Sequence, residues 1–355
     1  MCGRNGNCSR PFGKGQLRSA HFVIVLAVTL RADAARTDGN KMMGDPNVAA
    51  EDAPFDIGPV VAELRGLRAD WRKEKGHPAE FGALGFPSRH AIGRVIDTLA
   101  AALFPLRLGP PDLGAANEDC FVRASLESAL PLLAAQVRME LHYTRHERGG
   151  PAIERAVNAI VEELARRLPA IRRLIDGDTE AAFDGDPAAR SVDEVLLCYP
   201  GITALIHHRI AHELYHLGAP LVARIIAEVS HSRTGIDIHP GAQVGERCFI
   251  DHGTGVVIGQ TAIIGNRVRL YQAVTLGARS FSTDAEGRLV KNEPRHPIIE
   301  DDVTIYAGAT ILGRITIGKC SVIGGNVWLT HSVPPGSRVR QTQPSINIEP
   351  GDPCD

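Results

Sequence analysis

The chain has 355 residues, of which 44% are hydrophobic and 23% are charged, and its formal net charge is −2. A chain of this length can bury one large core or two smaller ones. The nearly balanced charge gives no reason to expect nucleic acid or an anionic membrane as a partner. The seven cysteines are scattered and form no Cys-x-x-Cys pair, which favours reduced thiols in a cytoplasmic protein over a disulfide framework or a zinc site.

Residues 1–54 are rich in Gly, Asn, Asp and Arg, and we expect them to be disordered. Basic residues there precede an apolar run from Phe22 to Leu30, which has the outline of a secretory signal but is too short to span a bilayer. Nothing further along the chain has the character of a secreted protein. We therefore interpret the segment as a disordered or non-native extension, with Met42 or Met43 as an alternative start.

Residues 55–232 carry helical patterns and predict an α-helical domain. The clearest apolar stripe has the spacing of one helix face and comprises Ile153, Val157, Ile160, Val161, Leu164 and Leu168. Helix-breaking strings separate the helices at Gly109-Pro110-Pro111, Gly149-Gly150-Pro151, Gly185-Asp186-Pro187 and Tyr199-Pro200-Gly201. Two more helices, near 202–217 and 219–231, lead directly into the next segment, so we expect this domain to cap it.

One of these helices contains His212-Glu213-Leu214-Tyr215-His216, which matches the zinc-binding pattern His-Glu-x-x-His. The third ligand at the usual short spacing is missing, although His231 lies further on. A five-residue pattern also matches often by chance. We therefore favour a polar stripe on an amphipathic helix over a metalloprotease site.

Residues 233–335 keep a six-residue period, which fits neither a single helix nor a single strand. It predicts a solenoid in which each short strand turns one aliphatic side chain inward, so that stacked coils share a core. Thirteen aliphatic residues carry the period: Ile238, Val244, Ile250, Ile258, Ile264, Leu270, Leu276, Ile299, Ile305, Ile311, Ile317, Ile323 and Leu329. The tail over residues 336–355 is irregular and polar.

The period is interrupted twice, and polar interruptions of a regular coil are natural places for chemistry. A two-residue insertion follows Asp251-His252, and a long loop runs from Ala278 to about Pro297. Asp237 lies fourteen residues before Asp251, so it can meet His252 on a neighbouring coil. A histidine oriented by a carboxylate is a common general base, although both residues could also occupy ordinary polar turns.

The long loop ends in Arg295-His296, which adds a second imidazole and a guanidinium suited to a carboxylate. The alternative for these two residues is a charged loop tip without a ligand. Pattern and spacing leave that choice open.

Three strings carry a resemblance to a known family: Asp237-Ile238-His239-Pro240-Gly241, the run from Asp251-His252 to Gly259, and Arg295-His296-Pro297. Together with the repeat and the helical first half, they make the chain similar to serine O-acetyltransferases. The resemblance covers residues 185–335 well and the earlier helices in outline. It implies an α+β protein, with an N-terminal α-helical domain followed by a C-terminal left-handed parallel β-helix.

The resemblance also implies a reaction, the transfer of an acetyl group from acetyl-CoA to the hydroxyl of L-serine in cysteine biosynthesis. His252 is then the base that takes the hydroxyl proton, and Asp237 orients it. The resulting alkoxide attacks the thioester carbonyl. His296 lines the same pocket.

Further residues bind the two substrates in this scheme. Arg295 holds the carboxylate of serine, and Asp186 and Asp251 are on the side of its amine. Acetyl-CoA is a co-substrate, with no bound cofactor and no metal. It lies between adjacent subunits of a homotrimer or a dimer of trimers, along the backbone of Gly277, Ala278, Ala307 and Gly325, where small residues allow close approach.

The chain departs from the family pattern at three points. Gln260 stands where relatives commonly carry Glu, and the loop from Ala278 to Pro294 is longer than usual. The chain ends in Asp352-Pro353-Cys354-Asp355, not in the terminal Ile that many relatives insert into O-acetylserine sulfhydrylase. The resemblance therefore gives only weak support for a stable complex with that enzyme, which is left open. Inhibition by cysteine at the serine site follows from the resemblance alone.

Three alternatives remain. Another hexapeptide O-acyltransferase, acting on a sugar or an antibiotic, shares the histidine base but does not need Arg295 for an α-carboxylate. A γ-type carbonic anhydrase binds zinc through three histidines of the same kind of solenoid, and here only His252 and His296 are suitably placed. The third alternative is a scaffold without catalysis.

Overall fold

The computed structural model describes residues 56–74, 85–145, 150–291 and 293–342. The expected extension over residues 1–54, with its signal-like run and Met42 or Met43, lies outside these ranges. Helix α1 (Gly58–Glu74) has an apolar face that is exposed and includes Val60, Leu64 and Leu67. Within the described ranges, no helix combines the length and the apolarity needed to cross a bilayer.

The other helices are α2 (Arg89–Leu103), α3 (Pro105–Leu108), the 3₁₀ turn η2 (Ala115–Asn117), α4 (Glu118–Arg145), α5 (Pro151–Gly185), α6 (Val192–Cys198), α7 (Pro200–Leu217) and α8 (Pro220–Thr234). Proline occupies the first turn of α3, α5, α7 and α8, where its missing N–H removes no helical hydrogen bond. Within the described ranges, the predicted breaker strings also lie at helix ends: Gly109 follows α3, α5 runs from Pro151 to Gly185, and α7 begins at Pro200.

The helical core is built around α5, which is longer than its predicted stripe. Ile153, Val157 and Leu164 are buried as expected, and the same face continues beyond Pro169 through Ile171 and Ile175. Proline inside a helix loses one hydrogen bond. Here the apolar face on both sides of Pro169 is buried, so the helix continues to Gly185.

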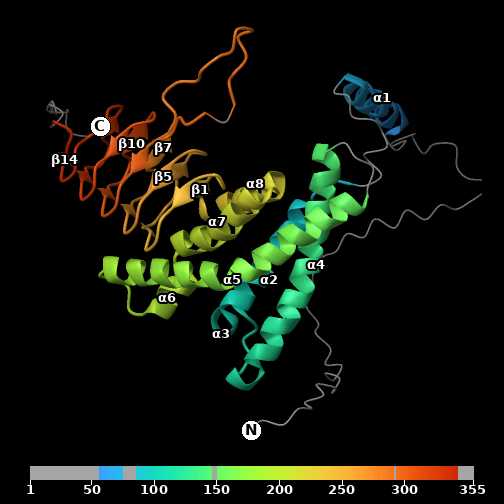
Figure 1. Cartoon of the computed structure of the whole chain (residues 1–355), viewed down its shortest axis with the longest axis horizontal. Helices are drawn as coiled ribbons and strands as arrows, with labels where there is room; N and C mark the ends of the chain where they lie inside the picture. The colour runs from blue at the N-terminus through green and yellow to red at the C-terminus, as the bar shows by residue number, and fades with distance from the viewer. Residues whose placement is uncertain (1–55, 75–84, 146–149, 292, 343–355) are drawn as a thin grey trace, which may run out of the picture. The chain divides into compact units, whose positions relative to one another are not determined.

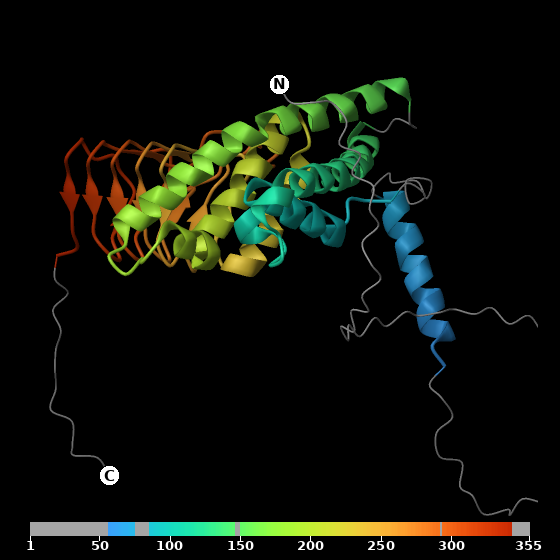
Figure 2. The same cartoon turned by 90° about the horizontal axis from the view of Figure 1, so that it is seen from below.

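The second half is a solenoid of very short parallel strands. They are β1 (Asp237–Ile238), β2 (Gln243–Val244), β3 (Phe249–Ile250), β4 (Val257–Ile258), β5 (Ile263–Ile264), β6 (Arg269–Leu270), β7 (Thr275–Gly277), β8 (Ile298–Ile299), β9 (Thr304–Ile305), β10 (Thr310–Leu312), β11 (Thr316–Ile317), β12 (Val322–Ile323), β13 (Trp328–Leu329) and β14 (Arg338–Val339). Figure 2 shows these strands stacked in successive coils.

The strands form three parallel sheets, which are the three faces of the solenoid. Sheet I has the order β1-β4-β7-β10-β13, sheet II the order β11-β8-β5-β2, and sheet III the order β14-β12-β9-β6-β3. The chain passes through sheets I, II and III in turn. Each residue between two strands therefore lies at one of three edges, which we call the I–II, II–III and III–I edges.

The six-residue period is confirmed. Each of the thirteen predicted aliphatic residues is the second residue of its strand, or the middle residue in the three-residue strands β7 and β10. All are at most 4% exposed, except the half-buried Val244. The solenoid is therefore the left-handed parallel β-helix that the family resemblance implied, behind an α-helical first half.

One domain boundary needs correction. The tail was expected to be irregular from residue 336, but β14 pairs in parallel with β12, with Val339 opposite Ile323. Sheet III thus continues past residue 335. The period failed to indicate this strand because Pro334 and Pro335 interrupt the pattern before it. Residues 343–355 lie outside the described ranges.

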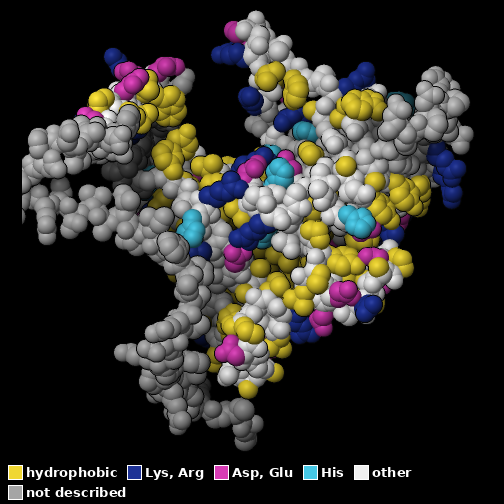
Figure 3. All heavy atoms as spheres, turned by 180° about the vertical axis from the view of Figure 1, so that it is seen from behind, with side chains coloured by type: hydrophobic (Ala, Val, Ile, Leu, Met, Phe, Trp, Pro, Cys, Tyr) yellow, Lys and Arg dark blue, Asp and Glu magenta, His cyan; other side chains and the backbone are white. Residues whose placement is uncertain are grey.

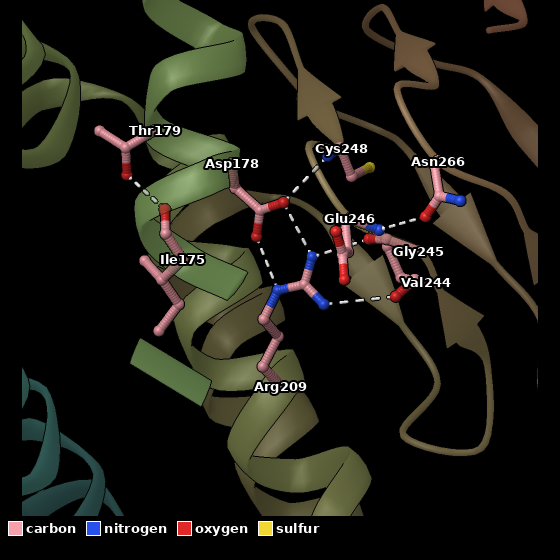
Figure 4. A network of polar contacts seen from close by, with 9 residues as sticks. All are labelled: Ile175, Asp178, Thr179, Arg209, Val244, Gly245, Glu246, Cys248 and Asn266. Atoms are coloured by element: carbon pink, nitrogen blue, oxygen red, sulfur yellow. Dashed lines mark hydrogen bonds and ion pairs between the residues drawn. The ribbon is translucent and has the colours of Figure 1, made fainter. Parts of the chain in front are cut away.

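A buried ion pair joins the helices to the first coil (Figure 4). Asp178 of α5 accepts hydrogen bonds from Arg209 Nε and Nη2 of α7, at 2.6 and 2.8 Å, and from the Cys248 backbone N–H at 2.9 Å. Arg209 also donates to the carbonyls of Val244 and Gly245. Burial lowers the pKa of Arg209, but the hydrogen bond and charge of Asp178 outweigh it and hold that pKa above its ordinary value. The helical domain is thereby fixed on the solenoid.

The long loop between β7 and β8 has structure of its own. Val290 N–H donates to the Ser282 carbonyl at 2.9 Å, and Arg288 pairs with Asp284 at 3.0 Å. These contacts make a hairpin-like arm, drawn in orange, that projects from the solenoid in Figure 1. The arm leaves and rejoins the solenoid at the I–II edge, where Arg295 and His296 follow it.

Candidate active site

His252 stands at the III–I edge, between β3 and β4. Its φ is 57°, in the left-handed region, and Ala273 and Asn326 at the corresponding corners of later coils have φ of 58°. Since the same conformation recurs from coil to coil, it belongs to the corner and not to the site. The imidazole is 71% exposed, and its Nε2 lies 3.8 Å from Asp251 Oδ1.

Asp186, at the end of α5, belongs to the same edge. Its carboxylate accepts hydrogen bonds from the Tyr199 hydroxyl at 2.5 Å and from the Ala188 N–H at 2.8 Å. These bonds, that of Tyr199 first, lower the pKa of Asp186, and the charges of His252 and Arg269 act in the same direction. The hydrogen bond to Asp186 raises the pKa of Tyr199 to about 12. The pair is therefore a carboxylate and a neutral phenol at neutral pH.

Asp237 also borders this edge, but its contacts differ from the expectation. Its Oδ1 lies 3.9 Å from Arg224 Nη1 of α8. Between Asp237 and His252, both within the described ranges, there is neither a hydrogen bond nor an ion pair. The carboxylate within ion-pair distance of His252 in the described ranges is that of Asp251, at 3.8 Å, and the orienting role of Asp237 stays a prediction.

Arg295 and His296 lie at the I–II edge, on the other side of sheet I. Arg295 Nη2 donates to Gln260 Oε1 at 3.0 Å, and Gln260 Nε2 donates to the Tyr215 hydroxyl at 3.0 Å. Arg295 also lines a cavity of about 160 Å³ together with Arg279 and Arg314. Glu293 lines the same cavity, so three guanidinium-bearing residues face one carboxylate-bearing residue there. The excess of positive charge suits a carboxylate or another small anion.

His296 is 6% exposed and neutral at neutral pH. Burial, followed by the charges of Arg295 and Arg314, lowers its pKa to about 4. Its Nδ1 accepts a hydrogen bond from the Thr261 N–H at 3.1 Å, and the Thr261 hydroxyl lies 2.8 Å from the same nitrogen. Because Nδ1 is an acceptor, the proton of the neutral ring is assigned to Nε2. His296 can thus donate a hydrogen bond from Nε2.

The predicted residues therefore fall into two groups within one chain. Asp186, Asp251 and His252 belong to the III–I edge, and Arg295 and His296 to the I–II edge. The residues expected to line acetyl-CoA divide in the same way. Ala307 and Gly325 lie at the III–I edge, Ala278 lies at the I–II edge, and Gly277 is the last residue of β7 beside that edge. Sheet I separates the two groups.

The His-Glu-x-x-His string of α7 has structural contacts. His212 Nδ1 lies 2.9 Å from the Pro240 carbonyl of the first coil, and Glu213 pairs with Arg167 of α5. The rings of His212 and His216 pack against each other, with centroids 4.4 Å apart. These contacts agree with a helix packed on the solenoid and leave Glu213 engaged in an ion pair.

Within the described ranges, one group of three potential metal ligands converges: Glu228, His231 and Asp237, with ligand atoms within 4.8 Å of one another. Arg224 already pairs with Glu228 at 2.6 Å and with Asp237 at 3.9 Å. The group contains one histidine, unlike the three-histidine site of a γ-type carbonic anhydrase.

A cavity of about 390 Å³ lies elsewhere, in the helical domain. Four of its six charged side chains are paired with each other, Arg107 with Asp193 and Arg172 with Asp176, both at 2.8 Å. None of the predicted residues lines it. Charges of both signs and histidines gather instead near the middle of the face shown in Figure 3, where apolar side chains are interspersed among them.

Two polar residues of the candidate site were missed by sequence reasoning. Tyr199 appeared only as part of a helix-breaking string, and Thr261 was not singled out. Tyr199 could have been suspected because its string and Asp186 flank the same short helix. Nothing in the sequence distinguishes Thr261 from the other threonines of the coils.

Comparison with known proteins agrees with this geometry. Residues 296–331 match the family described as bacterial transferase hexapeptide (six repeats). The chain is 55% identical over 271 residues to a plasmid serine acetyltransferase of Synechococcus elongatus. The aligned region covers 75% of this chain and 85% of that protein. It is 48% identical over 167 residues to the serine acetyltransferase of Bacillus subtilis, across 47% of this chain and 73% of that protein.

Among solved structures, serine acetyltransferase isoform 3 of Entamoeba histolytica in complex with cysteine superimposes with a TM-score of 0.63 at 36% identity. The match covers 73% of this chain and 84% of that one. The helical first half, the three-sided solenoid and an identity above one half over three quarters of the chain agree with one another. This chain belongs to the serine acetyltransferase family.

Proposed function

We propose that the protein transfers an acetyl group from acetyl-CoA to the hydroxyl of L-serine, giving O-acetylserine and CoA. The observation that carries this proposal is the set of Asp186, Asp251, His252, Arg295 and His296 in a chain 55% identical to a named serine acetyltransferase. Each member has a chemistry that this acceptor needs. A sugar acceptor would need neither the carboxylates nor the guanidinium.

Serine carries an ammonium and a carboxylate that flank its hydroxyl. The carboxylates of Asp186 and Asp251 suit the ammonium, and hydrogen bonds keep Asp186 ionised. At the other edge, Arg295 suits the carboxylate, with Arg279 and Arg314 bordering the same cavity. Between such anchors, the hydroxyl can be presented to one base.

His252 is that base in our proposal. Its exposed imidazole takes the hydroxyl proton as the serine oxygen attacks the thioester carbonyl. When the tetrahedral intermediate collapses, the C–S bond breaks and the same proton passes to the departing CoA sulfur. Asp251, 3.8 Å from Nε2, stabilises the imidazolium formed between these steps. We assign His296 the role of a hydrogen-bond donor, because its low pKa makes it a poor base.

The two edges must come together for this chemistry, and they cannot do so within one chain, because sheet I lies between them. We propose a homotrimer in which the III–I edge of one copy faces the I–II edge of the next. Acetyl-CoA would then lie in the groove between them, with Ala307 and Gly325 on one wall and Gly277 and Ala278 on the other. A dimer of such trimers and the cytoplasmic location remain further proposals.

A thiol-release assay with acetyl-CoA tests the proposal, with L-serine and sugars compared as acceptors. We expect serine-dependent CoA release that falls roughly 10²–10⁴-fold in His252→Ala. The matched control is His90→Ala, which removes an exposed histidine of helix α2 and should leave the rate unchanged. The proposal would be contradicted if the wild type released no CoA in the presence of serine, or if a sugar were the better acceptor. Stoichiometric zinc in the purified protein would favour the carbonic anhydrase alternative.

A further inference from the structure

Thr261 lies at the I–II edge of the second coil, shortly before β5. The long loop rejoins the solenoid on the next coil, just before β8, which pairs with β5. It stands between β4 and β5 and is half-buried. Thr261 takes part in five polar contacts. All of them go to Arg295, to His296 or to Arg314, which itself contacts the His296 carbonyl at 3.0 Å.

The Thr261 hydroxyl oxygen accepts two backbone hydrogen bonds, from Arg295 N–H at 2.9 Å and from His296 N–H at 3.2 Å. A hydroxyl has two acceptor lone pairs and one donor hydrogen. With both lone pairs facing N–H groups, its hydrogen is left for His296 Nδ1, 2.8 Å away. The Thr261 backbone N–H donates to the same nitrogen at 3.1 Å.

These four contacts fix more than the position of the loop end. They hold two consecutive backbone N–H groups, the orientation of the imidazole and the tautomer of the ring. Since Nδ1 receives two hydrogens, the ring carries its own proton on Nε2. The Thr261 carbonyl in turn accepts from Arg314 Nη1 at 2.6 Å, so the third arginine of the cavity is held by the same residue.

We propose that Thr261 is a positioning residue for the serine-binding half of the active site, which it builds by orienting Arg295 and His296 and by setting the Nε2–H tautomer of His296. This inference rests on the proposed function, in which Arg295 and His296 face serine. It extends that function to a residue that touches neither substrate. Loss of the Thr261 hydroxyl should therefore weaken serine binding more than acetyl-CoA binding.

The kinetic experiment uses the full-length protein with Thr261→Val, which keeps the shape and the backbone N–H but removes the hydroxyl. We expect the KM for serine to rise by about tenfold or more, because two backbone donors lose their acceptor. The KM for acetyl-CoA should stay within about twofold. Thr261→Ser keeps the hydroxyl and should restore the serine KM to within about threefold of the wild type.

Thr316→Val is the matched control. Thr316 lies on sheet II, and its hydroxyl makes no hydrogen bond to any other described residue. The same substitution there should leave both KM values unchanged. A fall in thermal stability shared by Thr261→Val and Thr316→Val, without the split between the two KM values, would overturn the proposal, as would a Thr261→Ser variant as impaired as Thr261→Val.

A spectroscopic arm tests the tautomer independently of turnover. In histidine-labelled protein, the ¹⁵N signals of His296, assigned by their loss in His296→Gln, should mark Nδ1 as unprotonated and Nε2 as protonated. Thr261→Val should disturb this pattern, and Thr316→Val should not. A protonated Nδ1 in the wild type contradicts the role of Thr261. If the wild type lacks serine-dependent activity while the spectra agree, the proposed function fails and the tautomer assignment stands.

Discussion

The space beside His296 is as specific as its hydrogen bonds. A Cβ atom added at Gly259 would lie 2.0 Å from Cδ2 and 2.1 Å from Nε2 of His296. Such contacts are far inside van der Waals distance, so the imidazole rests against a position that only glycine leaves open. Gly259 and Thr261 together define where the ring can be.

We therefore expect Gly259→Ala to lower kcat/KM for serine by at least about tenfold, because the ring must leave its hydrogen bonds with Thr261. The unfolding free energy should fall by only about 1–3 kcal/mol, the usual effect of one added methyl group in a packed site. Serine kinetics and urea unfolding measure the two quantities. Gly114→Ala is the control, because a Cβ there meets nothing within 4 Å. Wild-type kinetics in Gly259→Ala would contradict the described packing.

The sequence predicted the chemistry of single residues unevenly. Arg295 and His296 were identified because they interrupt the repeat and match the family string. The supporting Thr261 and Gly259 could not be identified, since small and polar residues are what any coil places between its aliphatic positions. Asp237 was expected beside His252 from spacing and from the family resemblance, and neither could tell that Arg224 of α8 lies 3.9 Å from its carboxylate. Its orienting role stays a prediction.

Helix α7 links the helical domain to the solenoid and carries four histidines. His207 and His208 are 3% and 4% exposed, and within the described ranges their Nδ1 atoms are buried without a hydrogen-bond partner. Burial, together with the charge of Arg233 on α8, lowers the pKa of His207 to about 4, against a smaller opposite effect of Asp97 on α2. The helix is thus packed around neutral imidazoles.

This packing predicts a loss of stability in acid. His207 has its ordinary pKa in the unfolded chain and a lower one in the folded protein, so the unfolded state binds the extra proton between pH 6.5 and 4. Stability is therefore complete above pH 6.5 and decreases as the pH falls through this range. His207 alone should contribute about 2 kcal/mol of loss between pH 7 and pH 4.5.

His207→Leu, which keeps the apolar packing and removes the titration, should lose correspondingly less stability over the same range. Urea unfolding at pH 7 and pH 4.5, at one fixed protein concentration, measures the difference. The exposed His331, replaced by Ala, serves as the control and should behave as the wild type does. Parallel pH curves for the wild type and His207→Leu would count against the assigned pKa.

The elements themselves were largely predictable. Apolar periodicity and breaker strings located the helices, and the six-residue period located the strands through Leu329. The unpredicted parts are those where two effects oppose each other. Helix α5 continues through Pro169 because burial of Ile171 and Ile175 outweighs the lost hydrogen bond, and β14 follows two prolines because pairing with β12 extends sheet III.

At the scale of the whole molecule, the six-residue period is the same on all three sheets. It therefore does not predict which edges of neighbouring copies would meet. The surface of sheet I provides that information. Two large apolar side chains point outward from it, Val257 at 39% and Trp328 at 69% exposure. Sheet III instead carries the basic residues Arg269 and Arg338 at outward positions. These two exposed apolar side chains lie between the two edges of the split site, where contact with a second copy would cover them. That position suits the proposed three-fold arrangement, in which each III–I edge meets the next I–II edge.

A complementation experiment tests this arrangement. His252→Ala loses the base at the III–I edge, and His296→Ala loses the donor at the I–II edge, so each variant alone should be nearly inactive. If sites form between copies, a mixed trimer has one interface in which both histidines are intact. Random assembly of equal amounts makes about three quarters of the trimers mixed, each with one intact site in three, so co-expression should restore about one quarter of the wild-type activity. If both edges instead served one chain, every site would lack one histidine and co-expression would restore nothing.

Mixing the two purified variants without subunit exchange gives the baseline activity. The mass of each variant in solution checks that both variants form trimers. Recovery near one quarter, and only after co-expression, therefore requires that His252 and His296 of different copies act in one site.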